Sequence, residues 1–479
     1  MRLTVPEPKI DLYNDGFADH DQLGRKATGD KLSDLVERID DPMVIALDGA
    51  WGSGKSFFLK CWVGEHLKRK GNTTQTVYFD AFGHDFLDDP LIALTGAIAE
   101  RFERDKKLPP AERESRVQKL KKFGWVLGKS SAKIGVSVAG HYAKKLVGEE
   151  CLEEFGKDLE KASQKGVATA EDEVKTLIDS GIGSEASEVF WREQRAKIVA
   201  MSAFREVLTE LTEPATKEQA EDDPKLQEGT PTGKLVVVID ELDRCRPDYA
   251  LSLLEIIKHF FNVPGVHFVL GCNMEALAWT IRSRYGENYD ARRYLQRFVN
   301  LKLRLPQIFN PELTKHPIEN YFFKTIEQMG LNESPYLPSL KSYISNMWYE
   351  QEFSIRDLHQ LLGRLAITTP PDHLDNYDEA LVAGLLILEA FAPDAISKVR
   401  MLEGKMQEVT GPLKLRDPLE DADHQECINW AAWAACLGDI NDIRFEVAVG
   451  SNNDCFANGH DRERIRNLLE QHIDVFETH

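Results

Sequence analysis

The sequence has few cysteines, no long uncharged apolar stretch and no excess of basic residues. Its seven cysteines are scattered and form no CxxC pair, which favours reduced thiols in the cytoplasm over a disulfide framework. No stretch is apolar and uncharged over the about 18 residues of a membrane span, so no transmembrane helix is expected. The first residues lack a basic segment followed by an apolar one, so no signal peptide is expected either.

The charge balance excludes further classes of function. The formal net charge is −20 over 479 residues, which disfavours a nucleic-acid-dependent motor, and we expect neither DNA nor RNA as the primary ligand. Histidines and cysteines near the C-terminus have no regular ligand spacing, so we expect no zinc site. The length allows two or three domains with a large core.

What the sequence does contain is a phosphate-binding loop. An apolar run at 43–47 enters a glycine turn and continues into a helical run, with the pattern Gly49-x-x-x-x-Gly54-Lys55-Ser56. Glycines allow successive backbone N–H groups to point at phosphate oxygens. Lys55 is expected to reach the β- and γ-phosphates, and Ser56 to ligate Mg²⁺. The nucleotide-binding residues predicted here are Gly49, Ala50, Trp51, Gly52, Ser53, Gly54, Lys55, Ser56 and Phe57.

A second anchor follows the apolar run 234–239. Asp240 stands at the end of this run, where a carboxylate can hold Mg²⁺ directly or through water. Glu241 is the first candidate for polarising or deprotonating an attacking water, and Asp243 is its rival. If neither acts, both are solvated loop acids.

Other polar residues can reach the γ-phosphate or stabilise its transfer. Asn273 ends the next expected strand and either hydrogen-bonds the phosphate or caps a turn. One arginine of the 290–297 segment is expected to act as an arginine finger, in the same chain or in a neighbouring subunit, unless all of them form surface ion pairs. Arg356 either senses the phosphate or pairs locally with Asp357. The arginines of the 290–297 segment are Arg292, Arg293 and Arg297.

Alternating strands and helices predict a parallel sheet covered on both faces. We expect residues 1–102 and 231–307 to form the two halves of the nucleotide-binding domain, 103–230 a largely helical insertion and 308–479 a helical C-terminal domain. Between Arg101 and Val147 the insertion has 13 Lys and Arg against 4 Asp and Glu. This stretch is either a solvated amphipathic face or an element that docks a partner or a membrane surface.

Several segments together resemble the KAP family of P-loop NTPases, a branch of the additional-strand P-loop ATPases. The similar segments lie in the order that is typical of the family. They are AspGlnLeuGlyArg (21–25), GlyAlaTrpGlySerGlyLysSer (49–56), ValTyrPheAspAlaPhe (77–82), IleAspGluLeuAspArgCysArgPro (239–247), TyrLeuGlnArgPheValAsnLeuLysLeuArgLeuPro (294–306) and SerIleArgAspLeu (354–358).

The resemblance implies a sheet of strand order 5-1-4-3-2 followed by a helical region. It also implies Mg²⁺-dependent ATP hydrolysis, assembly or switching driven by nucleotide, and a place in bacterial phage defence. The expected protein is thus a cytoplasmic, homo-oligomeric ATPase that works with partner proteins of a defence system. The family more often has Asp at the positions of Glu241 and Asn273, and many members carry transmembrane helices where this chain has its insertion. The alternative is a scaffold that binds nucleotide with negligible turnover and docks through the basic stretch.

Overall fold

The computed structural model describes most of the chain outside the insertion. The described residues are 2–6, 8–21, 23–87, 89–104, 114, 117–121, 201–202, 204–222, 227–305, 317–347, 354–368, 375–401, 403–420, 422–439, 441–449 and 462–473. The basic stretch beyond residue 121 and the acidic segment 149–158 therefore lie outside the described residues. Within the part that is described, no helix is both long and apolar enough to cross a membrane, and no disulfide joins two cysteines.

The centre of the molecule is a five-stranded sheet in which every pair of neighbouring strands is parallel. The spatial order is β2-β3-β4-β1-β5, which is the predicted order 5-1-4-3-2 read from the opposite edge. The strands are β1 (Met43–Asp48), β2 (Thr74–Asp80), β3 (Lys234–Asp240), β4 (Val266–Cys272) and β5 (Leu301–Arg304).

Helices cover both faces of this sheet, as its composition requires. Along β3, Val237 and Ile239 belong to one hydrophobic cluster, whereas Val236 and Val238 belong to the other, because successive strand residues point to opposite faces. Buried strands of this kind are β-branched and apolar throughout. Helices α5, α12 and α13 contribute to the first cluster, and α2 and α3 to the second. The elements packed around the sheet are α1 (Phe17–His20), α2 (Lys26–Arg38), α3 (Lys55–Leu67), α4 (Ala81–His84), α5 (Pro90–Glu103), η1 (Leu242–Arg244), α12 (Pro247–Phe260), α13 (Met274–Tyr285) and α14 (Ala291–Leu295). The short helix α11 (Lys217–Asp222) has exposed side chains and contributes to neither cluster.

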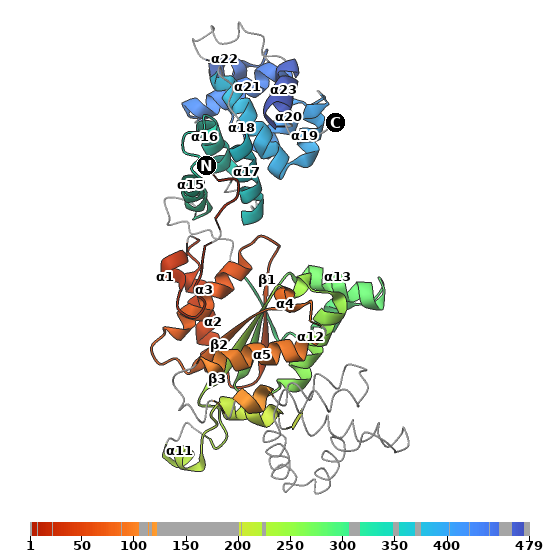
Figure 1. Ribbon diagram of the computed structural model, residues 1–479. Coiled ribbons are helices and arrows are strands. Elements are labelled where there is room, and N and C mark those ends of the chain that lie inside the picture. Colours follow the sequence, from red (N-terminus) through yellow and green to blue (C-terminus); the bar gives the residue numbers. More distant parts are fainter. Residues whose placement is uncertain are drawn as a thin grey trace.

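The helices from α15 onward share a hydrophobic cluster of their own and form a separate group above the sheet in Figure 1. The start of the chain belongs with this group, because the Arg2 N–H donates to the Met329 carbonyl at 2.8 Å and Val5 packs on the same cluster. Its elements are α15 (Pro317–Met329), α16 (Leu337–Met347), α17 (Ile355–Ile367), α18 (Asn376–Phe391), α19 (Pro393–Arg400), α20 (Met406–Leu413), α21 (His424–Leu437), α22 (Ile443–Val449), α23 (Arg462–Leu468) and the π-helical turn η3 (Leu469–Ile473).

The structure departs from the local sequence pattern in three segments. The apolar run 76–82 predicts a strand throughout, but β2 ends at Asp80, whose carboxylate accepts the Gly83 N–H at 2.8 Å and so caps α4. The pattern of 409–424 predicts a connection, yet α20 extends into this stretch as far as Leu413. The segment 299–305 contains only the short edge strand 301–304.

Candidate nucleotide site

The phosphate-binding loop lies between β1 and α3, at the carboxyl end of the sheet. Gly52 (φ 78°) and Gly54 (φ 81°) adopt left-handed backbone conformations that a residue with a Cβ enters only at a cost. Lys55 is buried, and its ammonium donates to the carbonyls of Gly49 at 2.6 Å and Ala50 at 3.0 Å. Burial lowers the pKa of Lys55. The predicted loop is therefore formed, and Lys55 lies within it.

The two predicted metal ligands meet. Asp240 is 1% exposed, and its carboxylate accepts hydrogen bonds from the Tyr78 hydroxyl at 2.6 Å and from the Glu241 N–H at 3.0 Å. Burial raises the pKa of Asp240, while the Tyr78 hydroxyl and the nearby Ser56 side chain oppose this rise. A buried carboxylate beside a hydroxyl fits Mg²⁺, which takes oxygen ligands and is usually held by one or two carboxylates with phosphates and water.

Tyr78 is a residue of this site that sequence reasoning did not identify. The registers Tyr78↔Val238 and Asp80↔Asp240 show that Tyr78 lies diagonally opposite Asp240 on the neighbouring strand, a distance that an aromatic side chain can span. The signal was a tyrosine two positions before the acidic end of the strand. The part that Tyr78 plays at the site could be recognised only once the pairing of β2 with β3 was known.

The two candidate acids for water activation have different partners. Glu241 has a left-handed backbone (φ 58°), and its carboxylate pairs with Arg244 at 3.0 Å. Burial raises the pKa of Glu241, and Arg244 opposes that rise. Asp243 is 9% exposed and accepts the indole N–H of Trp51 at 2.6 Å. This second contact joins the phosphate-binding loop to the acidic segment after β3.

Asn273 and the predicted finger arginines have partners within the chain, and their roles toward the phosphate stay predictions. The Asn273 Oδ1 accepts the N–H groups of Glu275 at 3.0 Å and Ala276 at 3.2 Å, which makes it the N-cap of α13. The Arg292 guanidinium pairs with Glu275 at 2.7 Å, and that of Arg297 lies over the Tyr294 ring. Arg293 is exposed. These contacts are the ones expected if Asn273 caps a turn and the arginines lie on the surface, the alternatives given by the sequence.

Arg356 lies at the loop. It occupies the first turn of α17, whose N-terminus is closed by a capping box of Ser354 and Asp357. The Ile355 N–H donates to the Gly52 carbonyl at 3.0 Å. A Cβ added to Gly52 would lie 2.7 Å from the Arg356 Cβ, so the loop and the helix fit together only because residue 52 is glycine. The phosphate-binding loop thus touches the C-terminal helical group directly.

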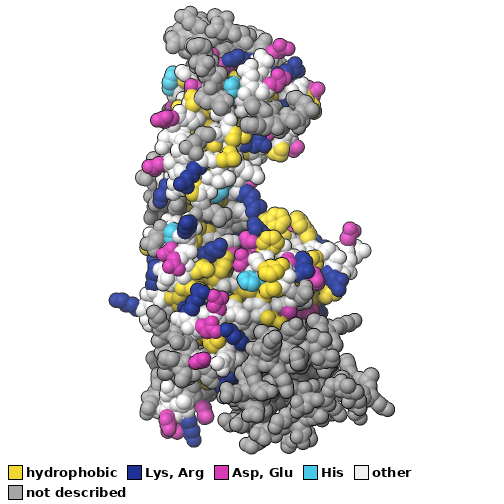
Figure 2. Space-filling model, in the orientation of Figure 1, with side chains coloured by type: hydrophobic (Ala, Val, Ile, Leu, Met, Phe, Trp, Pro, Cys, Tyr) yellow, Lys and Arg dark blue, Asp and Glu magenta, His cyan; other side chains and the backbone are white. Residues whose placement is uncertain are grey.

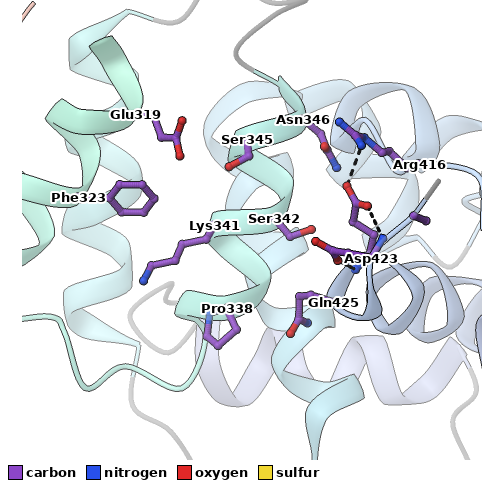
Figure 3. A pocket seen from close by; sticks show the side chains of 12 residues that line it. Glu319, Phe323, Pro338, Lys341, Ser342, Ser345, Asn346, Arg416, Asp423 and Gln425 are labelled. Carbon is purple, nitrogen blue, oxygen red and sulfur yellow. Dashed lines mark hydrogen bonds and ion pairs between the residues drawn. The ribbon is translucent and has the colours of Figure 1, made fainter. Parts of the chain in front are cut away.

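A separate cavity of about 590 Å³ lies within the C-terminal helices. Figure 3 shows Lys341 and Ser342 of α16 between side chains of α15 and those around the start of α21. Asp423 and Glu426 form the capping box of α21, and Glu426 also pairs with Arg416 at 3.2 Å. The carboxylates of Asp423 and Glu426 are therefore already engaged in capping and ion pairing at the start of α21.

A comparison with protein families agrees with this architecture. The family model described as "KAP family P-loop domain" matches residues 25–370. No curated protein matches the chain. Among solved structures, the Aeropyrum pernix ORC2 protein in its ADPNP–ADP complexes is 13% identical and has a TM-score of 0.31, and the match covers 77% of this chain and 74% of that one. The ADP form of the same protein is 10% identical, also with a TM-score of 0.31, and the match covers 85% of each chain. The family match spans well over half of the sequence, and the chain therefore belongs to the KAP family of P-loop NTPases.

Proposed function

We propose that this nucleotide-binding P-loop NTPase is a cytoplasmic, Mg²⁺-dependent ATPase that works as a conformational switch. The observation that carries the ATPase part is that Ser56, in the first turn of α3, lies near the buried carboxylate of Asp240 at the end of β3. These two groups would hold Mg²⁺, which when bound neutralises charge on the β- and γ-phosphates. Lys55 would release the Gly49 and Ala50 carbonyls and bind the phosphates instead.

Glu241 is the residue that we assign to the attacking water. It follows the metal-binding Asp240 directly, and its pKa is raised by burial, which brings a carboxylate closer to the basicity that proton transfer at neutral pH requires. Asp243 already accepts the Trp51 indole, so we assign it to positioning the loop.

The switch rests on the contact between loop and helix. Gly52 belongs to the loop that would wrap the phosphates, and its carbonyl accepts the first N–H of α17. A change in the loop on binding ATP would therefore act on α17 without an intermediate element. Because α17 packs in the core of the C-terminal helices, these helices are the element whose arrangement nucleotide would bias.

Assembly into a homo-oligomer is supported by apolar side chains around the site. Figure 2 shows hydrophobic side chains gathered on the sheet side of the notch between the two parts of the molecule. Large side chains exposed on the loop, on α4 and just after it, and on α13 are Trp51 (44%), Phe82 (50%), Phe86 (76%) and Trp279 (56%). Apolar side chains that remain exposed often mark an interface. A role in phage defence is proposed from the family resemblance alone.

The test is ATP binding and turnover by purified wild type, Lys55→Ala and Glu241→Gln, with particle mass measured with and without ATP. Lys70→Ala, an exposed lysine beyond α3, is the matched control. We expect Lys55→Ala to lose binding, Glu241→Gln to bind without turnover, and the mass to rise with ATP. Lys55→Ala binding ATP as tightly as wild type would refute the site. Protection of bacteria from phage by wild type but not by Lys55→Ala would support the defence role.

A further inference from the structure

Arg25 contacts the phosphate-binding loop from a backbone that the Asp21 carboxylate holds in place. The Asp21 carboxylate accepts the N–H groups of Leu23 at 3.1 Å and Lys26 at 2.9 Å, an arrangement that closes the turn and starts α2. Gly24 supplies the left-handed backbone (φ 66°) between them. These contacts fix the backbone from which the Arg25 side chain reaches the loop.

The guanidinium of Arg25 contacts the back of the loop. Its Nη1 donates to the Ser53 carbonyl at 2.8 Å and more distantly to the Gly54 carbonyl at 3.4 Å. The residue is only 9% exposed, and burial lowers its pKa to about 10. Among the described residues no carboxylate lies within 4.0 Å of this buried cation, although Asp21 acts on it from further away.

The direction of these carbonyls sets the direction of the next amides. In a trans peptide the C=O of one residue and the N–H of the next point in opposite directions. A Ser53 carbonyl held by Arg25 therefore turns the Gly54 N–H away from Arg25, toward the opposite side of the loop. The Gly54 carbonyl, which also accepts the Phe58 N–H at 3.0 Å, fixes the Lys55 N–H in the same way.

We propose that Arg25 is a positioning residue of the nucleotide site, which orients the Gly54 and Lys55 amides toward polyphosphate and adds a buried positive charge behind the loop. This inference rests on the proposed function. The ligand class is the polyphosphate of a nucleoside triphosphate, and inorganic tripolyphosphate shares the chemistry. When anionic phosphates bind on one side of the loop, they compensate the cation on the other, because a charge buried without a counter-charge is costly.

The test is calorimetric binding of ATP and of tripolyphosphate to wild type, Arg25→Ala, Arg25→Lys and the exposed-arginine control Arg38→Ala on the same helix. We expect Arg25→Ala to weaken both ligands by roughly 10- to 100-fold, the worth of a hydrogen bond to a charged group. Arg25→Lys should retain part of the affinity. Low-millimolar guanidinium chloride, compared with potassium chloride, should restore part of it to Arg25→Ala.

The thermal melting temperature of each unliganded protein distinguishes a loss of loop positioning from a loss of folding stability. The inference is overturned if Arg25→Ala binds both ligands like wild type. It is equally overturned if affinity falls only together with the unliganded melting temperature and neither lysine nor guanidinium restores it. A wild type that binds neither ligand would overturn the proposed function and this assignment together, whereas binding by wild type and Arg25→Ala alike would overturn this assignment only.

Discussion

The contact between Gly52 and α17 makes a prediction that can be isolated with a matched pair of glycines. Gly52 and Gly71 have nearly the same left-handed backbone, with φ of 78° and 76°. A Cβ on Gly71 meets no atom within 4 Å, whereas one on Gly52 would lie 2.7 Å from the Arg356 Cβ and 3.1 Å from the Ser354 hydroxyl. Both alanine variants therefore strain the backbone, and only Gly52→Ala also separates the loop from the helix.

Two effects set the expected loss of unfolding free energy: the strain of the left-handed backbone and, for Gly52→Ala, the lost contact with α17. A left-handed backbone costs a residue with a Cβ about 1–2 kcal/mol, so Gly71→Ala should lower the unfolding free energy by that amount. Gly52→Ala adds the loss of the hydrogen bond from Ile355, at roughly 0.5–1.5 kcal/mol, and the displacement of α17. We expect Gly52→Ala to be the less stable variant by about 1 kcal/mol or more.

The assay is hydrogen–deuterium exchange of α17 peptides with and without a non-hydrolysable ATP analogue. Wild type and Gly71→Ala should show a nucleotide-dependent change of exchange in α17, and Gly52→Ala should lose that change while its own α17 exchanges faster throughout. If Gly52→Ala kept the full nucleotide response, the loop-to-helix route for the switch would be wrong. Equal destabilisation by both variants would show that the contact contributes nothing to folding.

The remaining predictions concern titration and fluorescence. His267 is fully buried on β4, and burial with help from Lys234 lowers its pKa from 6.5 to about 4. The free energy of unfolding should therefore be highest above pH 6.5 and fall by roughly 3 kcal/mol as the pH drops to 4. Urea unfolding of His267→Val should show a shallower decline with pH. An equally steep decline would mean that His267 is already charged in the folded protein. Arg244→Ala should raise the pKa of Glu241 further, so the acidic limb of kcat against pH should move to higher pH, and an unmoved limb would separate Glu241 from the chemistry. ATP should change the tryptophan emission of wild type but not of Trp51→Phe, and titrations that match would place Trp51 away from the nucleotide.

Most of the nucleotide domain could be predicted from local sequence signals. The strands β1, β3 and β4 are apolar runs that end in Asp48, Asp240 and Cys272, and their lengths were predicted because a fully buried strand leaves little choice of residue. The parallel direction came from the alternation of strands and helices and the strand order from the family resemblance, and the structure confirms both. Ser56 and Asp240 were both assigned to Mg²⁺ in advance, because a phosphate-binding-loop serine and an acid at the end of an apolar strand can supply its oxygen ligands.

The errors arose where a side chain acts across the chain or overrides local propensity. Asp80 ends β2 by capping the next helix, although the residues after it are apolar enough for a strand. Pro412 lies inside α20, where proline is normally taken to end a helix. Arg25 belonged to a segment noted only for its resemblance, because its partners are carbonyls of residues 53 and 54, which carry no signal in the side-chain pattern.

The left-handed backbone of Glu241 bears on how this site can change over generations. A glycine at that position would relieve strain of about 1–2 kcal/mol and would leave the neighbouring strand and Asp240 in place. Selection for stability alone would therefore favour Glu241→Gly, at the cost of the carboxylate and its pairing with Arg244. If Glu241 activates water as proposed, an acid at position 241 would be kept only where turnover is needed, and a lineage that no longer needed turnover would be free to lose it while still binding nucleotide.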